Sequence, residues 1–328
     1  MMRDPASIAG SKSRISIVIV SYKSLNFIDQ CLTPIAHRAD WDIILWDNDS
    51  GDGIGGHVRR HYPHVRVVES PENLGFAAGN NRAFRHCRGD YVLLLNPDAF
   101  LRDAAQVEQL AEYLEAHADV AACGPQLLHG DGSHQVGDAG WRISLPTVLV
   151  HGFALQRAAP FLRGLYLTSP SLRRREHVPV DWICGACLMV RRSVIDSLGG
   201  LDESSFLYGE DIEWGTRMRR AGWQCHYLPR VKVQHLQGAT QREAGQAFRS
   251  FAWLDDIARR YRVSGGRWGY GVMRLGLAAG YIGRALIWAV RARILRRPEA
   301  RERAVIKGAI AREYAAHIWR WPRFDTPD

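Results

Sequence analysis

The sequence lacks the long apolar run that a membrane-spanning helix requires. In its C-terminal part the longest stretch without a charged residue, 275–283, has nine residues, whereas a helix that crosses a bilayer needs about 20 apolar residues. Residues 1–14 are polar and lack the apolar core of a secretory signal, so we expect them to form a flexible N-terminus. These absences predict a cytoplasmic protein that contacts the inner face of the cytoplasmic membrane only peripherally.

Cysteine is also scarce, and its spacing provides no disulfide framework. The six cysteines are scattered over 328 residues, and only Cys184 and Cys187 form a C-x-x-C pair. A zinc ribbon would need a second pair of this spacing, and a redox pair would sit in a much smaller fold. We therefore interpret Cys184 and Cys187 as a structural pair.

Most of the chain carries no surplus of charge. The net charge is +9, but residues 242–328 contain 18 Lys and Arg against 8 Asp and Glu, and the rest of the chain contains 25 against 26. A basic tail can bind nucleic acid or an anionic membrane. The tail is rich in aliphatic side chains and contains no nucleic-acid-binding motif, so the expected partner is an anionic membrane surface and not nucleic acid.

The first part of the chain alternates short β-branched runs with stretches of helical length. Strands are predicted over 15–20, 42–46, 65–68, 91–95 and 120–123, and helices over 27–37, 54–62, 76–87 and 103–117. Such alternation predicts an α/β fold with a mostly parallel central sheet, and ligands bind such sheets at the carboxyl ends of the strands.

The expected domains follow from this pattern. A catalytic domain is expected over 15–240, with a nucleotide-binding half over about 15–125 and an acceptor half over about 126–240. Residues 130–180 show little periodicity and are predicted to be a long irregular connection on the acceptor side. A basic helical extension is expected over 241–328.

Carboxylates follow three of the predicted strands or open the helix after them. Asp47 ends the second strand, Asp98 lies in an Asn-Pro-Asp turn, and Glu210 and Asp211 begin a helix. A single carboxylate in such a place often only caps the next helix, but three at one sheet edge suit transfer from a diphosphate. A hard divalent cation, Mg²⁺ or Mn²⁺, would neutralise the diphosphate, and a carboxylate would act as general base.

Six segments in order resemble glycosyltransferase family 2, whose members are inverting enzymes with the GT-A fold. The pattern is most similar to rhamnosyltransferase-like members and covers about 15–238. The segments are 16–24 (SIVIVSYKS), 46–53 (WDNDSGDG), 73–81 (NLGFAAGNN), 91–100 (YVLLLNPDAF), 182–192 (WICGACLMVRR) and 201–223 (LDESSFLYGEDIEWGTRMRRAGW).

The resemblance assigns roles to residues at the strand ends. Asp47 is expected to bind the nucleobase through its ring N–H, and Asp98 to bind the metal ion. Asn96 is expected near the ribose or the diphosphate, where the usual family motif has a second Asp. Asp211 is expected to be the catalytic base, with Glu210 orienting the acceptor or tuning that base. For this pair the alternative is a capped helix start.

Further residues complete the expected site. His235 is expected to approach the metal ion, with a purely structural histidine as the alternative. Trp182 is expected on the acceptor side. The remaining donor-binding residues are small or uncharged side chains that suit close backbone approach and hydrogen bonds to hydroxyls: Ser21, Tyr22, Asn73, Gly75, Asn80 and Gly185.

The basic tail is predicted to contain an amphipathic helix over 270–297. At helical spacing, apolar side chains fall on one side: Ile282, Leu286, Val290 and Ile294. Arginines fall on the opposite side: Arg274, Arg284 and Arg291. This pattern is typical of a helix in a membrane interface, although five glycines between 269 and 283 oppose helix formation. The alternative is a helix packed on the catalytic domain.

The predicted function is sugar transfer, with inversion, from a nucleotide-diphospho-sugar to a hydroxyl of a glycan or of a polyprenyl-diphosphate-linked acceptor. By resemblance the donor is dTDP-L-rhamnose. Three alternatives stay open at this point: a UDP-hexose donor, a nucleotide-sugar-binding protein without catalysis, and nucleic-acid binding by the tail.

Overall fold

The computed structural model describes residues 14–204, 209–236, 238, 252–295 and 298–316. The chain divides into two compact units: 1–139 with 173–248, and 140–172 with 249–328. The second unit combines a segment from the middle of the chain with the C-terminal helices. Residues 140–172, expected in the acceptor half of the catalytic domain, therefore group with the C-terminal extension.

The first unit is built on a nine-stranded sheet with the order β3-β2-β1-β4-β10-β6-β11-β5, with β8 paired to β11. Strands β3, β2, β1, β4, β6 and β11 share one direction, while β10, β5 and β8 run the opposite way. The bounds are β1 Ile15–Ser21, β2 Asp42–Asp47, β3 Arg66–Glu69, β4 Tyr91–Leu95, β5 Ala99–Phe100, β6 Val120–Leu128, β8 Val178–Val180, β10 Cys187–Arg191 and β11 Gln224–His235. The predicted α/β fold with a mostly parallel sheet is confirmed.

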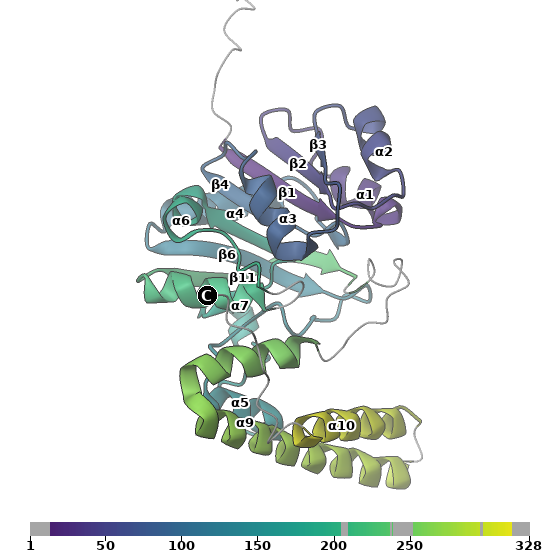
Figure 1. Ribbon diagram of the computed structural model, residues 1–328, viewed down its shortest axis with the longest axis vertical. Coiled ribbons are helices and arrows are strands. Elements are labelled where there is room, and N and C mark those ends of the chain that lie inside the picture. The colour runs from purple at the N-terminus through teal and green to yellow at the C-terminus, as the bar shows by residue number, and fades with distance from the viewer. Residues whose placement is uncertain (1–13, 205–208, 237, 239–251, 296–297, 317–328) are drawn as a thin grey trace, which may run out of the picture. The chain divides into compact units, whose positions relative to one another are not determined.

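Helices lie on both faces of this sheet (Figure 1). Their bounds are α1 Leu25–Leu32, α2 Ile54–His61, α3 Gly75–Phe84, α4 Ala105–Ala116, α6 Arg192–Leu198 and α7 Glu210–Arg220. In β1 the residues Ile15, Ile17 and Ile19 join one buried cluster with α1, α2 and α4. Because neighbouring strand residues point to opposite faces, Val20 faces α3, where a Cβ on Gly79 would lie 2.9 Å from Val20 Cγ1. The helices predicted between the early strands are confirmed, with ends shifted by a few residues.

The register of the parallel strands brings the ends of β1, β2 and β3 to one edge. Ser21 pairs with Asp47, and Asp47 pairs with Glu69. At the other side of the sheet the long strand β11 pairs His235 with Ala99 of β5. The Leu236 amide donates to the Asp98 carbonyl at 3.0 Å, which ties the end of β11 to the Asn-Pro-Asp turn.

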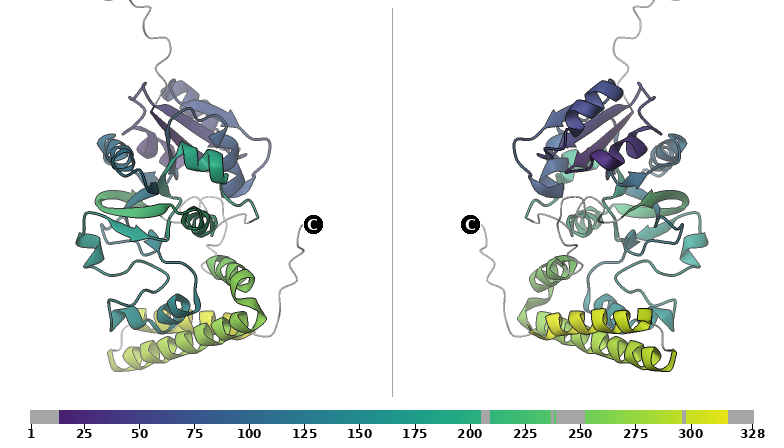
Figure 2. Two further views of the ribbon diagram at one scale, coloured as in Figure 1. Left: turned by 90° about the vertical axis from the view of Figure 1, so that its left-hand side faces the viewer. Right: turned by 90° about the vertical axis from the view of Figure 1, so that its right-hand side faces the viewer.

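The second unit is helical. It contains α5 (Leu145–Phe153), the short 3-10 helix η2 (Leu155–Arg157), the 44-residue helix α9 (Ala252–Leu295) and α10 (Pro298–Ala316). α9 and α10 lie side by side as an antiparallel pair (Figure 2). The sequence analysis missed α5, which lies in the predicted irregular connection. Its start has a capping box between Ser144 and Thr147 and a proline in the first turn, and these local signals could have revealed it.

Two glycines of α9 lie where α5 packs against it. A Cβ on Gly280 would lie 2.5 Å from the backbone carbon of Gly152, and one on Gly276 would lie 2.2 Å from the Leu149 side chain. These glycines oppose helix formation in isolation, but they allow two helix backbones to approach closely. The predicted helix is confirmed, because tertiary packing outweighs the intrinsic preference of glycine.

One side of α9 is apolar and exposed. Ile282, Leu286, Val290 and Ile294 are exposed as the sequence predicts, with Leu286 62% exposed. Arg274 on the other side is buried, and its guanidinium donates to the hydroxyl of Tyr270 at 3.0 Å. Among the described residues, no helix combines the length and apolar character that a bilayer span requires.

Candidate active site

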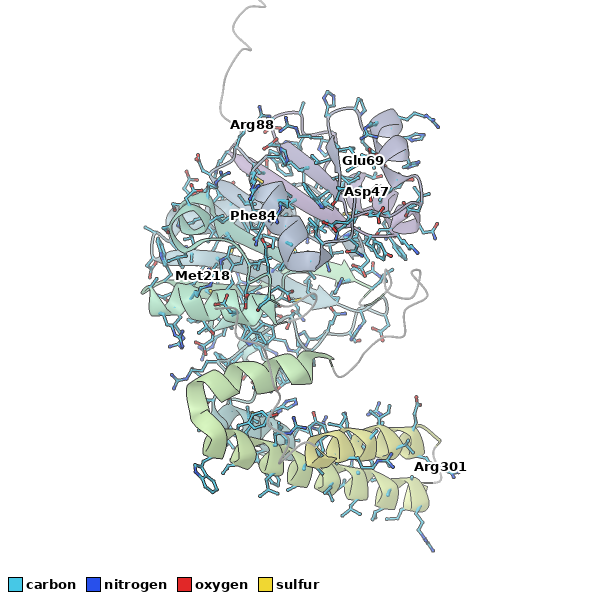
Figure 3. The ribbon with its side chains drawn as sticks, viewed as in Figure 1. Asp47, Glu69, Phe84, Arg88, Met218 and Arg301 are labelled. Atoms are coloured by element: carbon cyan, nitrogen blue, oxygen red, sulfur yellow. The ribbon has the colours of Figure 1, made fainter. Side chains whose placement is uncertain are left out.

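Asp47 ends β2 in a largely buried position. Its Oδ1 accepts a hydrogen bond from the Ser50 amide at 3.0 Å, and Glu69 lies opposite it at the end of β3 (Figure 3). Burial raises the pKa of Asp47, the hydrogen bonds from Ser50 oppose that rise, and the nearby charges of Asp52 and Glu69 add to it. A carboxylate is therefore held at this edge against an unfavourable environment, which is common for residues that bind a ligand.

Ser21 lies beside Asp47 at the end of β1. Its side chain is fully buried, and its hydroxyl oxygen has no hydrogen-bond partner within the part of the chain that the structure describes. A buried hydroxyl without a partner is costly, so Ser21 fits contact with a bound donor. Tyr22 follows it, with the Lys23 ammonium 5.5 Å from the centre of its ring.

The loop before α3 is held by Asn48, a residue to which the sequence analysis gave no role. The Asn48 amide nitrogen donates to Asn73 Oδ1 at 2.8 Å and to the Gly75 carbonyl at 3.1 Å, and Asn48 Oδ1 accepts from the Leu74 amide at 3.0 Å. Gly75 has φ of +81°, which only glycine adopts readily. Asn48 therefore fixes the backbone that carries Asn73 and Gly75.

Two of the predicted donor-binding residues have packing roles in the structure. The Asn80 side-chain amide is buried and donates to the Phe76 carbonyl one turn earlier at 2.9 Å. A Cβ on Gly185 would lie 3.0 Å from the Phe76 ring. A larger residue at 185 would therefore press on α3, so glycine lets this segment lie close to the Phe76 ring.

Asp98 and His235 approach each other in a buried setting. His235 Nε2 lies 3.3 Å from Asp98 Oδ1, and His235 Nδ1 lies 2.7 Å from Gln135 Oε1. The Gln135 amide nitrogen faces the His235 carbonyl at 3.2 Å, which orients the Gln135 oxygen toward the ring. Since an amide oxygen only accepts, Nδ1 carries a proton, and Nε2 is the ring atom directed at the carboxylate. A proton or a cation between Nε2 and Oδ1 would complete this contact.

These two side chains fit part of a divalent-cation site. Mg²⁺ and Mn²⁺ are commonly held by one or two protein side chains together with substrate phosphates. Within the described ranges, no group of three or more His, Cys, Asp and Glu side chains could hold a metal ion by itself. Asp98 and His235 would thus hold the ion jointly with a diphosphate, with Gln135 orienting the imidazole. The sequence analysis missed Gln135, which lies 100 residues away from His235.

Asn96 shapes the turn that presents Asp98. Its carbonyl accepts from the Ala99 amide at 3.0 Å, and its own amide donates to the Ala186 carbonyl at 2.9 Å. The Asn-Pro-Asp turn is therefore attached through its backbone to the segment Gly185–Ala186.

Asp211 lies in the first turn of α7, on the other side of the same segment. Its Oδ2 accepts from the Gly185 amide at 3.4 Å, and its Oδ1 accepts from the Ile212 amide at 2.7 Å. Gly209 precedes the helix with φ of +85°. Carboxylates in a first turn are stabilised by the unpaired amides and the helix dipole, so both Glu210 and Asp211 are favourably placed as anions.

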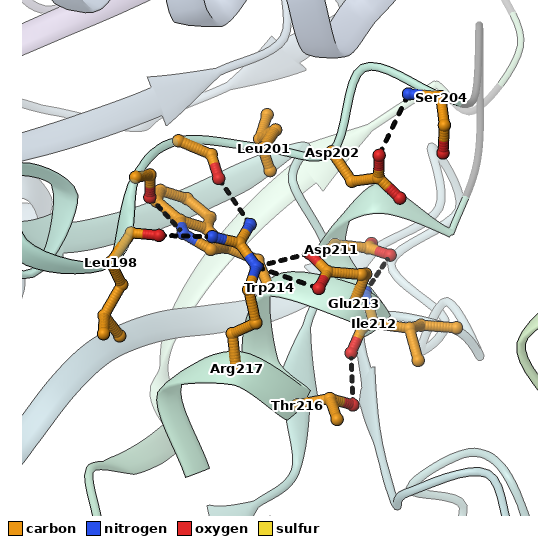
Figure 4. A network of polar contacts seen from close by, with 12 residues as sticks. Leu198, Leu201, Asp202, Ser204, Asp211, Ile212, Glu213, Trp214, Thr216 and Arg217 are labelled. Atoms are coloured by element: carbon orange, nitrogen blue, oxygen red, sulfur yellow. Dashed lines mark hydrogen bonds and ion pairs between the residues drawn. The ribbon is translucent and has the colours of Figure 1, made fainter. Parts of the chain in front are cut away.

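A network anchors the start of α7 to the preceding loop (Figure 4). Arg217 forms an ion pair with Glu213 at 2.8 Å and donates to the Leu198 carbonyl at 2.6 Å. From α3, the Asn81 side chain exchanges two hydrogen bonds of 2.8 Å with the Leu201 backbone. The loop over 198–201 is therefore held from both α3 and α7.

The pKa of the Cys184 thiol is affected by the carboxylates around this segment. Burial raises the pKa of its thiol, followed by the nearby carboxylate of Asp211 and, more weakly, those of Asp138 and Glu210. All six cysteines are free thiols, so Cys184 and Cys187 form no disulfide, as expected for a structural pair.

Asp138 is a buried carboxylate that the sequence analysis did not single out. Its Oδ2 accepts from the Tyr227 hydroxyl at 2.7 Å and lies 3.0 Å from His134 Nε2, and its carbonyl accepts from the Cys184 amide at 2.9 Å. It therefore supports the Cys184–Gly185 backbone from behind.

Trp182 is buried against α7. A Cβ on Gly215 would lie 3.0 Å from the Trp182 Cα, so the close approach of α7 to this residue depends on glycine. The structure gives Trp182 a packing contact, and its expected acceptor role stays a prediction.

The structure thus brings most of the expected residues to one edge of the sheet. Gly185–Ala186 contacts both the Asp211 side chain and the backbone of Asn96 in the turn that carries Asp98, and Ser21 and Asp47 end neighbouring strands. This arrangement can bind a nucleotide at the ends of β1 and β2 and a diphosphate at Asp98, with a carboxylate close by to take a proton.

Comparison with known proteins identifies the class. Residues 16–199, more than half of the chain, match the family described as "Glycosyl transferase family 2", and residues 150–315 match "Glycosyl transferase family group 2". The chain therefore belongs to glycosyltransferase family 2 and is a glycosyltransferase, as the sequence predicts.

Curated relatives agree with this assignment. The chain is 28% identical over 236 residues to the N-acetylglucosaminyl-diphospho-decaprenol L-rhamnosyltransferase of Mycobacterium tuberculosis, covering 67% of this chain and 75% of the relative. It is 27% identical over 232 residues to the rhamnosyltransferase WbbL of Escherichia coli, covering 67% and 83%.

Solved structures share the fold. The mannosyltransferase PcManGT from Pyrobaculum calidifontis, in complex with GDP-Man and Mn²⁺, superposes with a TM-score of 0.54 at 17% identity, covering 95% of this chain and 89% of that one. GalNAc-T7 with UDP, GalNAc and Mn²⁺ gives a TM-score of 0.51 at 11% identity, covering 78% and 57%. The predicted GT-A fold is confirmed.

The contributions of Asp47 and Glu69 to the stability of the fold should change with pH in opposite directions. Because the pKa of Asp47 is raised in the folded protein, its charge lowers stability as pH rises through that pKa. Asp47→Asn should therefore raise the melting temperature at pH 7, and this gain should vanish as pH falls below the usual Asp pKa. Thermal unfolding followed by circular dichroism between about pH 2.5 and pH 8 measures the effect.

Glu69→Gln is the matched control at the neighbouring strand end. The ion pair with Arg59 lowers the pKa of Glu69, so its charge adds stability above the usual Glu pKa and loses it as pH falls through the folded value. This variant should melt at a slightly lower temperature at pH 7 and match the parent in acid. An Asp47→Asn variant that melts below the parent at pH 7 would contradict the analysis.

Proposed function

We propose that this enzyme transfers L-rhamnose from dTDP-L-rhamnose to a hydroxyl of a lipid-linked or polysaccharide glycan, with inversion. The observation that carries the proposal is that the Gly185 amide donates to Asp211 while the Ala186 carbonyl accepts from the amide of Asn96, two residues before Asp98. A diphosphate bound at Asp98 would then lie within reach of the Asp211 carboxylate. The rhamnosyltransferase names of the two curated relatives support this choice of sugar.

The nucleotide part of the donor would bind at the ends of β1 and β2. Asp47 can accept the ring N–H of the base, and the partnerless Ser21 hydroxyl gains a partner there. Thymine and uracil both carry this N–H, so Asp47 alone does not separate dTDP from UDP donors. A UDP-hexose donor is therefore the competing candidate.

The diphosphate would bind at the Asn-Pro-Asp turn. A divalent cation held by Asp98 and His235 would neutralise the departing charge, and the Mn²⁺ in the complexes of PcManGT and GalNAc-T7 supports this choice of cofactor. Asn96 in place of a second carboxylate leaves one negative charge fewer beside the phosphates, which lowers the repulsion that the donor meets.

Asp211 would accept the proton of the acceptor hydroxyl. As the hydroxyl oxygen forms its bond to the anomeric carbon, the bond to the diphosphate breaks and the nucleotide leaves with the electron pair. The Gly185 amide and the first turn of α7 hold Asp211 in place, so the base needs no rearrangement before it acts. Glu210, in the same turn, would help to orient the acceptor.

The exposed apolar side of α9 supports contact with a membrane that carries the lipid-linked acceptor. Leu286, Val290 and Ile294 are exposed together on a helix of a basic unit, and such a helix binds anionic interfaces. The proposal therefore includes peripheral attachment to an anionic membrane surface on the cytoplasmic side.

A panel of nucleotide sugars tests the donor. With Mn²⁺ present, dTDP-L-rhamnose should stabilise the protein by about 2.7 kcal/mol at a hundredfold excess over its dissociation constant, measured as a thermal shift. Asp98→Asn should lose most of the metal-dependent part of this shift, while Asp196→Asn, a surface carboxylate on α6, should keep it. A shift with a UDP-hexose and none with dTDP-L-rhamnose would refute the rhamnose assignment.

Removing the base should separate binding from turnover. Asp211→Asn should lower kcat about 100- to 10,000-fold, the usual contribution of a general base, while donor binding measured by thermal shift stays unchanged. Asp196→Asn again serves as the control. Unchanged turnover in Asp211→Asn would favour a protein that binds nucleotide sugars without catalysis.

Breaking the apolar side of α9 tests membrane attachment. Leu286→Glu should reduce co-flotation with phosphatidylglycerol vesicles about tenfold, because a buried leucine contributes roughly 1.5–3 kcal/mol. Ala315→Glu, which adds the same charge at an exposed position of α10, should leave flotation near the parental level. Equal losses in the two variants would show that only net charge matters.

A further inference from the structure

The helical unit contains a group of cations for which the reaction proposed above has no use. It consists of Arg157 in η2, Arg284 and Arg291 in α9, and Arg303 and Lys307 in α10. None of the five forms an ion pair with a carboxylate of the described residues, whereas other arginines, such as Arg192 and Arg217, do. We call these five residues the cation cluster.

Two aromatic rings of α9 contact cations of the cluster from both helices. The guanidinium carbon of Arg284 lies 4.6 Å and the ammonium of Lys307 5.7 Å from the centre of the Tyr281 ring. Arg291 and Arg303 lie 5.1 and 4.9 Å from the Trp288 ring in the same way. Tyr281 and Trp288 are seven residues apart, so they share one side of the helix. Each ring therefore carries one cation from α9 and one from α10.

The cluster is partly buried and opens to solvent. Arg284 and Lys307 are half-buried, whereas Arg157, Arg291 and Arg303 are exposed. The Arg284 guanidinium donates to the His151 carbonyl at 3.4 Å, and its buried Nε has no partner within the described part of the chain. A buried donor without an acceptor is costly, and here it lies beside other cations.

Repulsion among these cations contributes to the lowered pKa values of Lys307 and His151. Burial, followed by the charges of Arg284, Arg157 and Arg303, lowers the pKa of Lys307 to about 8. Burial and then Arg284, Lys307 and Arg157 lower the pKa of His151 to about 3. Cations that disfavour one another in this way gain most from an anion placed among them.

We infer that the cation cluster is a binding site for a phosphate or diphosphate group. Arginine guanidinium groups bind phosphate oxygens through paired hydrogen bonds, and lysine adds a point charge. The aromatic rings hold the cations in place before the ligand arrives. The group can belong to a lipid or to a free diphosphate; the lipid-linked source rests on the proposed function, whose tests at Asp98 and Asp211 are independent of this site.

The chain offers a matched pair of double variants. Arg291→Gln with Arg303→Gln removes two exposed members of the cluster. Arg301→Gln with Arg312→Gln removes the same charge from exposed positions of α10 (Arg301 is labelled in Figure 3). At 100° per residue, Arg301 and Arg312 lie on the side of α10 opposite Arg303 and Lys307. Any difference in binding between the two variants is therefore caused by loss of the cluster and not by the change in net charge.

Titration calorimetry with inorganic pyrophosphate, in EDTA so that no divalent cation bridges it to the donor site, measures the shared chemistry. The cluster variant should bind pyrophosphate about tenfold or more weakly than the parent, and the control variant should match the parent. Equal losses in both variants, or no loss in either, would overturn the inference.

Vesicle flotation separates the two sources of the phosphate. The phosphate is a lipid headgroup if the cluster variant co-floats less than the control variant with phosphatidylglycerol vesicles, and both variants co-float equally with phosphatidylcholine vesicles. If flotation is the same and only pyrophosphate binding falls, the site takes a free diphosphate. Either result supports a phosphate site.

The melting temperature of the ligand-free variants excludes a purely structural role. Removing two mutually repelling cations should leave the melting temperature unchanged or raise it. A cluster variant that melts well below both the parent and the control variant would mean that these cations stabilise the fold, and the inference would fail.

Discussion

The backbone of Gly185–Ala186 is the contact on which the proposed site depends. Its amide meets Asp211 on one side, and its carbonyl meets the amide of Asn96 on the other. A Cβ at 185 would press on the Phe76 ring, so glycine lets this segment lie close to α3. One short piece of backbone thereby contacts both the Asp211 side chain and the turn that carries Asp98.

Around that segment the protein accepts several unfavourable polar arrangements. Burial raises the pKa of Asp47, the Ser21 hydroxyl has no partner among the described residues, and the buried His235 Nε2 lies 3.3 Å from Asp98 Oδ1. Each arrangement becomes favourable when a nucleotide, a diphosphate or a cation is bound. The cation cluster of the helical unit is also unfavourable without a ligand, because its positive charges repel one another. A bound anion would relieve that repulsion.

Much of the fold was readable from the sequence because the signals are local. Alternating β-branched runs and helical stretches identified β1 to β4 and the helices between them. The connection over 130–180 was the main omission: α5 is short, and its apolar face acquires a partner only when Gly276 and Gly280 of α9 come to lie against it. No pattern within nine residues reveals a partner more than a hundred residues away.

The sequence by itself determined the chemistry available at each strand end, because the residue that follows a strand and the turn that carries it are neighbours in the chain. It therefore placed Asp47, Asp98 and Asp211 in the site. Only the tertiary structure decided how these groups are held: Asn48 fixes the loop before α3, Gln135 orients His235, and Asp138 supports the backbone at Cys184. Those contacts join residues 25 to 100 positions apart, and long-range pairing of this kind arises from packing and not from any local spacing.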